Sequence, residues 1–326
     1  MDAGMIVGAP DLTSSIAGHS AVGLCSTAPE PAPAMPIQYG MQGYVIARGL
    51  IPEAALERVL RMYDRDIVPS NAQFYRQNTN RYERNAITAH GYVAQSFLDI
   101  HAYASFPGFR EAAFEIFFHP NLLSFISGLT GTRSHRLVQS MLFDLNTATP
   151  PHQDWWYVDS VPHGNLVAGW VALEDIHEEA GRFYVMAGSH RCTFHESGLP
   201  HSEWLARIRR YVDEHPELLH APGLKKGDVL FWNSRTIHGS LLTIDERFSR
   251  KSLTCHYVPG TMQFGNLFTT KSWARFRKFR GHEYWANQPE YSLKHMLMSR
   301  LKTMLYDHPA WVSMVRRFQR RGLGDY

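Results

Sequence analysis

The sequence predicts a mainly β fold with flanking helices, and three observations indicate it. From residue 134 onward, short alternating or apolar runs are separated by Gly, Pro and Asn, which is typical of an antiparallel barrel or sandwich. Helical periodicity is confined to segments before residue 130, to an insertion at 201–218 and to the end of the chain. The 326 residues are 44% hydrophobic and 13% aromatic, enough for a sizeable packed core.

The first part of the chain changes character near residue 37. Residues 1–36 are rich in Ala, Gly, Ser and Pro without periodicity, and we expect a flexible leader. The main domain is predicted over 37–265, beginning with a short strand at 44–47 and a helix opened by Pro52. The apolar stripe of this helix is Leu56, Val59, Leu60 and Tyr63.

A long polar segment at 70–92 has no clear periodicity, which favours a lid or binding loop over a simple connection. Helices are expected near 108–118 and 120–129, and a further helix within 201–218. The strands between and after them are predicted within 136–145, 166–175, 182–188, 227–233 and 251–258.

The last part, 266–326, is predicted to be a basic helical extension packed on the same domain, with Leu293, Met296, Leu297, Leu301 and Leu305 on one side. Residues 271–321 contain twelve Lys and Arg but only three acidic residues. Such a segment can contact an anionic membrane surface, nucleic acid or an acidic partner, or form a solvated face. We expect no specific nucleic acid ligand.

Three further features bear on location. No apolar run approaches the roughly 18 residues of a membrane-spanning helix, and no charged region precedes an apolar core near the N-terminus. Three widely spaced cysteines fit neither a disulfide framework nor a cysteine-based zinc site. We therefore expect a cytoplasmic protein, with peripheral membrane contact through the basic segment as a further option.

The stretch "PPHQDWWYVD" at 150–159 contains a candidate metal site. His152 and Asp154, two apart on an expected strand, would project to the same face. With 18 histidines in the chain, about one such pair is expected by chance. His177 and Glu179 form a similar pair, which we interpret as loop surface.

A possible third ligand strengthens the prediction that this pair binds a metal. His238 follows the strand in "KKGDVLFWNSRTIHGS" and lies in a polar segment, where a ligand at a barrel rim would sit. Two imidazoles and one carboxylate on one face of an iron leave coordination positions open, the set used by non-haem Fe(II) oxygenases. The alternative for His238 alone is a structural histidine with its hydrogen bonds satisfied.

Four motifs in order, "HQDWWY", "GWVALEDIHEEAGRFYVMAGSH", "GDVLFWNSRTIHGS" and "RKSLTCHY", resemble the phytanoyl-CoA dioxygenase family of Fe(II)/2-oxoglutarate-dependent oxygenases. The resemblance covers about residues 40–260. It implies a double-stranded β-helix core, the jelly roll of cupin-like proteins, with Fe(II) bound by His152, Asp154 and His238.

The resemblance also implies a 2-oxoglutarate site. Arg250 matches the anchor of the distal carboxylate, which suits the planar, permanently charged guanidinium. Arg247 is the competitor, but the strand that Arg250 opens would place Ser252, Thr254 and His256 on its face. Other positions matched to the co-substrate are Ser240, Trp170, Met141 and Gln153, with Gln139 on the same face as Met141. For Trp170 and Met141, plain core packing is the alternative.

The implied reaction consumes 2-oxoglutarate and O2, releases succinate and CO2, and hydroxylates an unactivated C–H bond. Asp154 favours hydroxylation, because halogenating relatives have a small residue there. We predict the substrate wall at Trp155, Trp156 and Tyr157, half of them pointing into the core, with Arg81 and Arg84 from the 70–92 loop. The substrate would be a small molecule, whether anionic, acyl or lipid-like, or carrier-bound.

Two other function classes remain open at this point. The chain could be a non-catalytic, cupin-like metal-binding module, or a basic adaptor for membranes or nucleic acid in which the barrel is scaffold. Arg250 and Ser240 discriminate against the first, because a pure metal site needs no buried carboxylate anchor.

Overall fold

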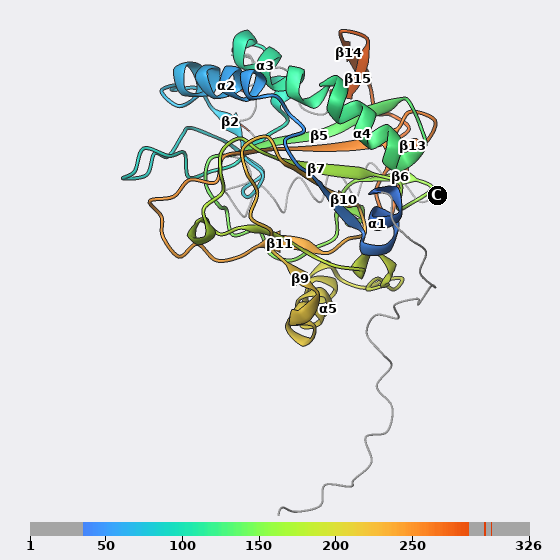
Figure 1. Ribbon diagram of the computed structural model, residues 1–326. Helices are drawn as coiled ribbons and strands as arrows, with labels where there is room; N and C mark the ends of the chain where they lie inside the picture. Colours follow the sequence, from blue (N-terminus) through green and yellow to red (C-terminus); the bar gives the residue numbers. More distant parts are fainter. Residues whose placement is uncertain (1–34, 287–296, 298–300, 302–326) are drawn as a thin grey trace, which may run out of the picture.

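The computed structural model describes residues 35–286, 297 and 301. A large sheet forms the centre of the molecule, and α2 (Glu53–Met62), α3 (Pro107–Phe117) and α4 (Pro120–Thr130) cover one of its faces (Figure 1). These helices lie within a residue or two of the predicted ranges. No helix among the described residues combines the length and apolar character needed to cross a lipid bilayer.

The large sheet has the strand order β1-β10-β7-β12-β5-β15-β14, with β4 also paired to β5. Each of the five predicted strand runs forms a strand, four of them in this sheet. In that order the strands are β1 (Tyr44–Ala47), β10 (Val229–Asn233), β7 (Val167–Ala172), β12 (Ser252–Pro259), β5 (His135–Phe143), β15 (His282–Trp285), β14 (Phe276–Phe279) and β4 (Phe97–Leu98).

A smaller sheet, β11-β8-β9, faces the large one, and α5 (His201–Glu214) lies beyond it (Figure 1). The predicted jelly-roll core is confirmed. The smaller sheet consists of β11 (His238–Ser240), β8 (Phe183–Met186) and β9 (Leu219–His220). The remaining elements are α1 (Met35–Gln42), β2 (Phe74–Tyr75), β3 (Tyr82–Glu83), β6 (Asp159–Val161), β13 (Gln263–Gly265), a π-helical turn η1 (Tyr63–Ile67), and the 3-10 turns η2 (Ile100–Ala102), η3 (Asp154–Trp156), η4 (Glu178–Ala180), η5 (Ser189–Arg191) and η6 (Pro216–Leu218).

The large sheet separates two apolar cores because its strands alternate between its faces. On β7, Val167 and Val171 pack on the helix side, whereas Ala168 and Trp170 pack toward the smaller sheet. Every residue of β7 is buried, as expected for a strand that is covered on both faces. The inner side chains of β7 therefore point into the space between the sheets.

The helical extension expected after residue 265 is wrong for residues 276–285. They form the hairpin β14–β15, and β15 joins the large sheet parallel to β5. Its turn residues Arg280 and Gly281 have φ angles of 46° and 90°, as a two-residue hairpin turn requires. Of the leader predicted over 1–36, residues 1–34 lie outside the described residues, whereas residues 35 and 36 begin the helix α1. Almost all of the predicted C-terminal helix also lies outside the described residues.

Candidate metal and co-substrate site

Three side chains from two distant segments meet at a cavity of about 540 Å³ between the two sheets. The ligand atoms of His152, Asp154 and His238 lie within 4.8 Å of one another, and within the described part of the chain they are the one such group. All three residues line the cavity. The arrangement matches the set predicted from the sequence.

Backbone pairing brings the two histidines together. His152 and His238 are bridged in antiparallel fashion, each backbone N–H donating to the other's carbonyl oxygen at 3.0 Å. Directly opposed residues of an antiparallel pair project to one side, and the ring centroids lie 4.3 Å apart. The segment preceding η3 and the strand β11 thus position both imidazoles.

Each imidazole has one nitrogen committed to the backbone. Nδ1 of His152 lies 2.9 Å from the carbonyl oxygen of Pro150, and Nδ1 of His238 lies 3.0 Å from that of Thr236. A ring that donates its Nδ1–H in this way keeps Nε2 as the free, metal-binding nitrogen. The two Nε2 atoms lie 3.7 and 3.4 Å from Oδ1 of Asp154.

Asp154 is placed by a turn rather than by a strand. The expectation that His152 and Asp154 share a strand face is wrong, because Asp154 begins η3. Its Oδ2 accepts a hydrogen bond of 2.8 Å from Nε1 of Trp232 on β10. Burial alone would raise the pKa of Asp154, but the neighbouring imidazoles, His238 and His256 above all, hold that pKa well below its usual range. The carboxylate therefore stays ionised and ready to bind a cation.

Arg250 lines the cavity with only 2% of its surface exposed. Its Nη1 donates to the carbonyl oxygen of Gly181 at 2.9 Å and to Oγ of Ser240 at 3.0 Å. Burial lowers the pKa of Arg250 to about 9, so the side chain is still cationic at neutral pH. No Asp or Glu of the described chain pairs with it, and a buried cation of this kind requires an anion.

The competing arginine lies elsewhere. Arg247 is exposed, and its Nε donates to Oδ2 of Asp245 at 2.9 Å. It therefore already has a carboxylate partner at the surface. Residues matched to the co-substrate line the same cavity, as do Gln139, Thr254 and two phenylalanines: Ser240, Trp170, Met141, Gln139, Phe143, Phe183 and Thr254.

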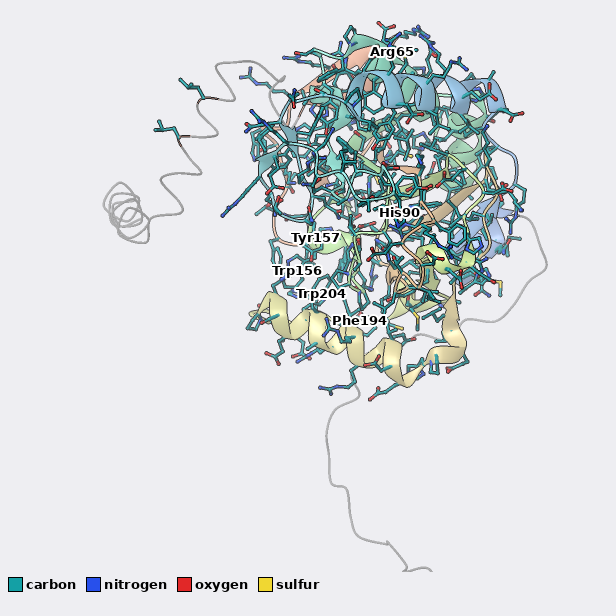
Figure 2. All side chains as sticks on the ribbon, turned by 90° about the vertical axis from the view of Figure 1, so that its left-hand side faces the viewer. Arg65, His90, Trp156, Tyr157, Phe194 and Trp204 are labelled. Atoms are coloured by element: carbon teal, nitrogen blue, oxygen red, sulfur yellow. The ribbon has the colours of Figure 1, made fainter. Side chains whose placement is uncertain are left out.

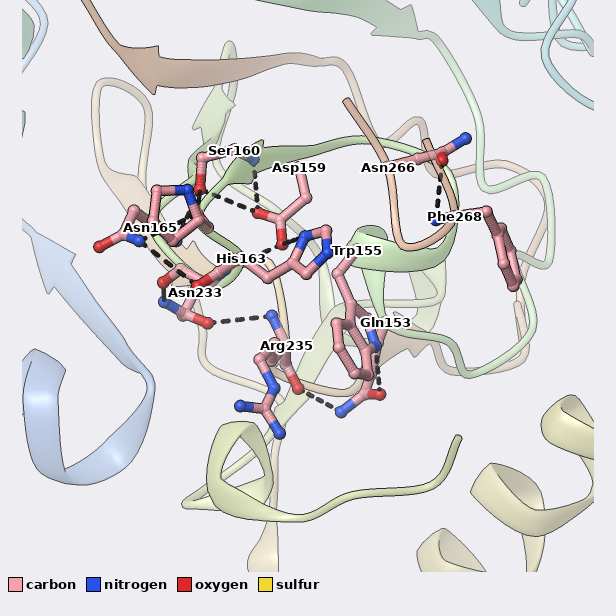
Figure 3. A network of polar contacts seen from close by, with 12 residues as sticks. Gln153, Trp155, Asp159, Ser160, His163, Asn165, Asn233, Arg235, Asn266 and Phe268 are labelled. Atoms are coloured by element: carbon pink, nitrogen blue, oxygen red, sulfur yellow. Dashed lines mark hydrogen bonds and ion pairs between the residues drawn. The ribbon is translucent and has the colours of Figure 1, made fainter. Parts of the chain in front are cut away.

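Gln153 does not reach the cavity, contrary to its assignment to the co-substrate. Its side chain is fully buried, donates to the carbonyl oxygen of Arg235 and accepts a 2.8 Å hydrogen bond from Nε1 of Trp155 (Figure 3). Asn233 accepts a 3.0 Å hydrogen bond from the backbone N–H of Arg235. This network braces the turn around Asp154 against the turn that leads into His238.

The three aromatic residues after Asp154 point in different directions. Trp155 is buried beneath Arg235, whose guanidinium lies 4.8 Å from its ring. Trp156 stacks on Trp204 of α5 at 4.4 Å, and Figure 2 shows both beside Tyr157 between the barrel and α5. Only Tyr157 lines the cavity. The substrate-wall prediction is therefore wrong for both tryptophans, because η3 turns their side chains away.

The 70–92 loop forms part of the cavity mouth, but through residues other than its arginines. Arg81 and Arg84 are exposed and do not line the cavity. The loop contributes its neutral side chains instead: Tyr75, Gln77, Asn78 and Asn80. Across the mouth, Tyr157 and His201 of α5 form a 2.6 Å hydrogen bond.

Sequence reasoning missed two residues that contact Asp154. Trp232 appeared only as an apolar strand residue, and His256 only as a residue on the face of Arg250. Period-two alternation from Arg250 places His256 in the barrel interior, so the signal for His256 was present. For Trp232 no local signal exists, because its indole meets Asp154 only through the fold.

The metal-binding side chains fit Fe(II), and the buried arginine beside them fits 2-oxoglutarate. Two free Nε2 atoms, an ionised carboxylate and an open cavity beside them correspond to a site with three protein ligands and vacant positions. A guanidinium that lines the same cavity and has no carboxylate partner among the described residues corresponds to a dicarboxylate ligand.

Comparisons with known proteins agree with this geometry. The family model "Phytanoyl-CoA dioxygenase (PhyH)" matches residues 39–247. The peroxisomal phytanoyl-CoA dioxygenase of Bos taurus is 24% identical over 243 residues, 69% of this chain and 68% of that protein. The same enzyme of Homo sapiens is 22% identical over 282 residues, 81% of this chain and 80% of that protein.

Solved structures show the same fold. The 2-oxoglutarate-dependent epimerase SnoN from nogalamycin biosynthesis matches with a TM-score of 0.51 at 18% identity, over 77% of this chain and 96% of that chain. EctD from S. alaskensis, solved with 2-oxoglutarate and 5-hydroxyectoine, matches with a TM-score of 0.52 at 18% identity, over 81% and 88%. The chain belongs to the phytanoyl-CoA dioxygenase (PhyH) family and is an Fe(II)/2-oxoglutarate-dependent dioxygenase.

Proposed function

We propose that the enzyme hydroxylates an unactivated C–H bond of a small-molecule substrate and releases succinate and CO2. One observation carries the co-substrate half of this proposal. The buried Arg250, which has no carboxylate partner in the described chain, faces the same cavity as the His152, Asp154 and His238 group. A metal-storage or sensor module would not need a buried cation there, since its burial costs free energy without an anionic ligand.

Different residues bind the co-substrate and exclude water from the site. Bound Fe(II), with 2-oxoglutarate and O2, supplies the oxidising chemistry. Arg250 and Ser240 orient the distal carboxylate, while Trp170 and Phe183, whose rings lie 5.9 Å apart, close the wall beside it. Apolar walls at the inner end keep water from the reacting atoms.

Asp154 supports hydroxylation over halogenation. A halide requires a coordination position that a small residue leaves open, and here a carboxylate occupies the place. Tyr157 near the mouth has a pKa raised to about 12, mainly by burial and also by the Asp154 charge, so its hydroxyl keeps its proton. That hydroxyl serves as a hydrogen-bonding group for a substrate and not as a base.

The outer part of the cavity supports a substrate whose reacting portion is uncharged. Among the described residues that line the cavity, the charged side chains are those of Arg250 and Asp154, and the rest of the wall consists of amides, hydroxyls, histidines and apolar groups. An anionic, lipid-like or carrier-bound substrate would have to place its charge outside this cavity. The basic segment that would recruit such a substrate, or contact a membrane in the cytoplasm, consists mostly of residues outside the described part of the chain.

The test of the proposed function needs no known substrate at first. Anaerobic titration of 2-oxoglutarate into the Fe(II)-loaded protein should produce a weak visible charge-transfer band, which His152→Ala should lack. Succinate release is then screened over compound classes with the same variant as control. A protein that binds Fe(II) but neither develops the band nor forms succinate would be a metal-binding module.

The adaptor alternative makes a separate forecast. A basic adaptor would bind DNA or anionic vesicles with a steep salt dependence and would form no succinate. Deleting residues 311–326 should lower activity only if the basic segment recruits the substrate, and unchanged activity at all salt concentrations would reject that role.

A further inference from the structure

We infer that His256 is a positioning residue, which together with Trp232 holds Asp154 in the orientation that Fe(II) needs. The inference rests on the metal role proposed for Asp154. His256 is 1% exposed and lines the cavity, and it is neither a proposed metal ligand nor a residue matched to the co-substrate.

The two oxygens of Asp154 face different groups. Oδ1 lies 3.7 Å from Nε2 of His152 and 3.4 Å from Nε2 of His238. Oδ2 accepts the 2.8 Å hydrogen bond from Trp232 and lies 3.3 Å from Nε2 of His256. Oδ1 is therefore the oxygen on the metal side, and Oδ2 is the oxygen on the side of the large sheet.

A small residue makes this arrangement possible. Trp232 on β10 and His256 on β12 both pair with Ala168 of β7, which lies between them. The three residues form one row across the sheet, and the methyl group of Ala168 leaves the space in which both larger side chains reach the same carboxylate. The rings of Trp232 and His256 stand nearly perpendicular, at 87°, with centroids 5.8 Å apart.

The imidazole of His256 has spare hydrogen-bonding capacity. Neither ring nitrogen has a hydrogen-bond partner within the described chain, because the 3.3 Å approach to Oδ2 does not have hydrogen-bond geometry. A buried polar group without a partner is costly, and contacts in a ligand-free site tighten when the ligand binds. A slight turn of the carboxylate toward an ion would complete the hydrogen bond from Nε2–H to Oδ2.

Trp232 and His256 would together determine which oxygen of the Asp154 carboxylate binds the metal. With Oδ2 held by two N–H donors, Asp154 offers the metal Oδ1 alone, and its side chain cannot rotate away from the two histidines. Outer partners of this kind orient a ligand and change metal affinity about 10- to 100-fold when removed.

Three substitutions test the inference on the full-length chain. His256→Leu and His256→Phe remove the nitrogens, while His256→Gln keeps an N–H donor at similar reach. Anaerobic Fe(II) titration should show affinity about 10- to 100-fold weaker for Leu and Phe, with Gln close to the wild type. His135→Phe is the matched control, since His135 is also a buried histidine, on the neighbouring strand β5, and bonds Thr130 instead of the cavity.

Each outcome decides the matter. Unchanged Fe(II) affinity in His256→Leu, or an equal loss in His256→Gln, would overturn the inference, since the latter would mean that the ring acts only by packing. If the Phe variant does not fold, as judged by circular dichroism, the Leu and Gln pair still decides. A wild-type protein that binds no Fe(II) would instead refute the proposed function.

Discussion

Within residues 35–286, two arginines are almost completely buried, one in the 70–92 loop and one in the wall of the cavity. Arg76 is 0% and Arg250 is 2% exposed. Arg76 donates to Asn85 Oδ1 at 2.7 Å, to the carbonyl oxygen of Glu83 at 3.2 Å and to that of Ser96 at 3.4 Å. Its guanidinium also lies 4.4 Å from the ring of Phe97, a favourable cation–π contact.

The difference between them lies in what each guanidinium faces. Arg76 is surrounded by acceptors from its own loop and the adjoining segment, so it fastens the loop to the domain. Arg250 donates to one carbonyl oxygen and one hydroxyl, lies 5.8 Å from the rings of Phe143 and Trp170, and lines the cavity. Equal burial thus accompanies a structural role in one region and a ligand-binding role in the other.

The strongest test of this contrast is Arg250→Met. Removing one partner of a buried charge pair costs roughly 2–5 kcal/mol, so 2-oxoglutarate affinity should fall about 30-fold or more. Fe(II) affinity should be retained, because the metal ligands lie elsewhere. Anaerobic titration of each ligand separately measures both.

The same variant should unfold at a urea concentration no lower than the wild type, since it removes a buried charge that has no ionic partner among the described residues. A large loss of stability together with normal 2-oxoglutarate binding would reverse the roles assigned to the two arginines.

Arg76→Met should show the opposite pattern. It leaves three acceptors without their charged donor, and we expect the free energy of unfolding to fall by about 2–4 kcal/mol. Urea denaturation measures the loss. Affinity for 2-oxoglutarate should stay near the wild-type value, and a loss comparable to that of Arg250→Met would show that the loop region also holds the co-substrate.

Arg250→Lys should have an intermediate effect. Lysine keeps the charge but not the planar pair of donors, and the loss of one charge-assisted hydrogen bond corresponds to roughly tenfold weaker 2-oxoglutarate binding. Competition against the charge-transfer band measures it. Affinity equal to that of the wild type would mean that charge alone, without the two-pronged geometry, recognises the carboxylate.

The smallest effect is expected for Arg247→Met. This arginine forms an exposed ion pair with Asp245, and exposed pairs contribute about 0–1 kcal/mol. Both stability and 2-oxoglutarate affinity should therefore remain within experimental error. A clear loss of 2-oxoglutarate binding would reopen the choice between Arg247 and Arg250.

Local patterns predicted much of the fold because they depend on neighbouring residues. Alternation and apolar runs placed β5, β7, β8, β10 and β12, and helix periodicity placed α2 to α5. Two predictions of secondary structure from local patterns were wrong. The helix prediction is wrong for the hairpin β14–β15, because the basic composition of 271–321 and the apolar spacing at 293–305 carry no information on the strand pairing of 276–285. The prediction of a strand is wrong for Asp154, which begins a turn.

The sequence by itself determined the kinds of ligand, their order along the chain and the period-two spacing that carries Arg250, Thr254 and His256 into one interior. Tertiary structure alone decided which groups are partners. Gln153 turned out to brace a neighbouring turn, Trp232 to hold Asp154, and Arg247 to be paired at the surface. Burial and pairing arise where segments far apart in the chain converge, and no local pattern encodes the distance between them.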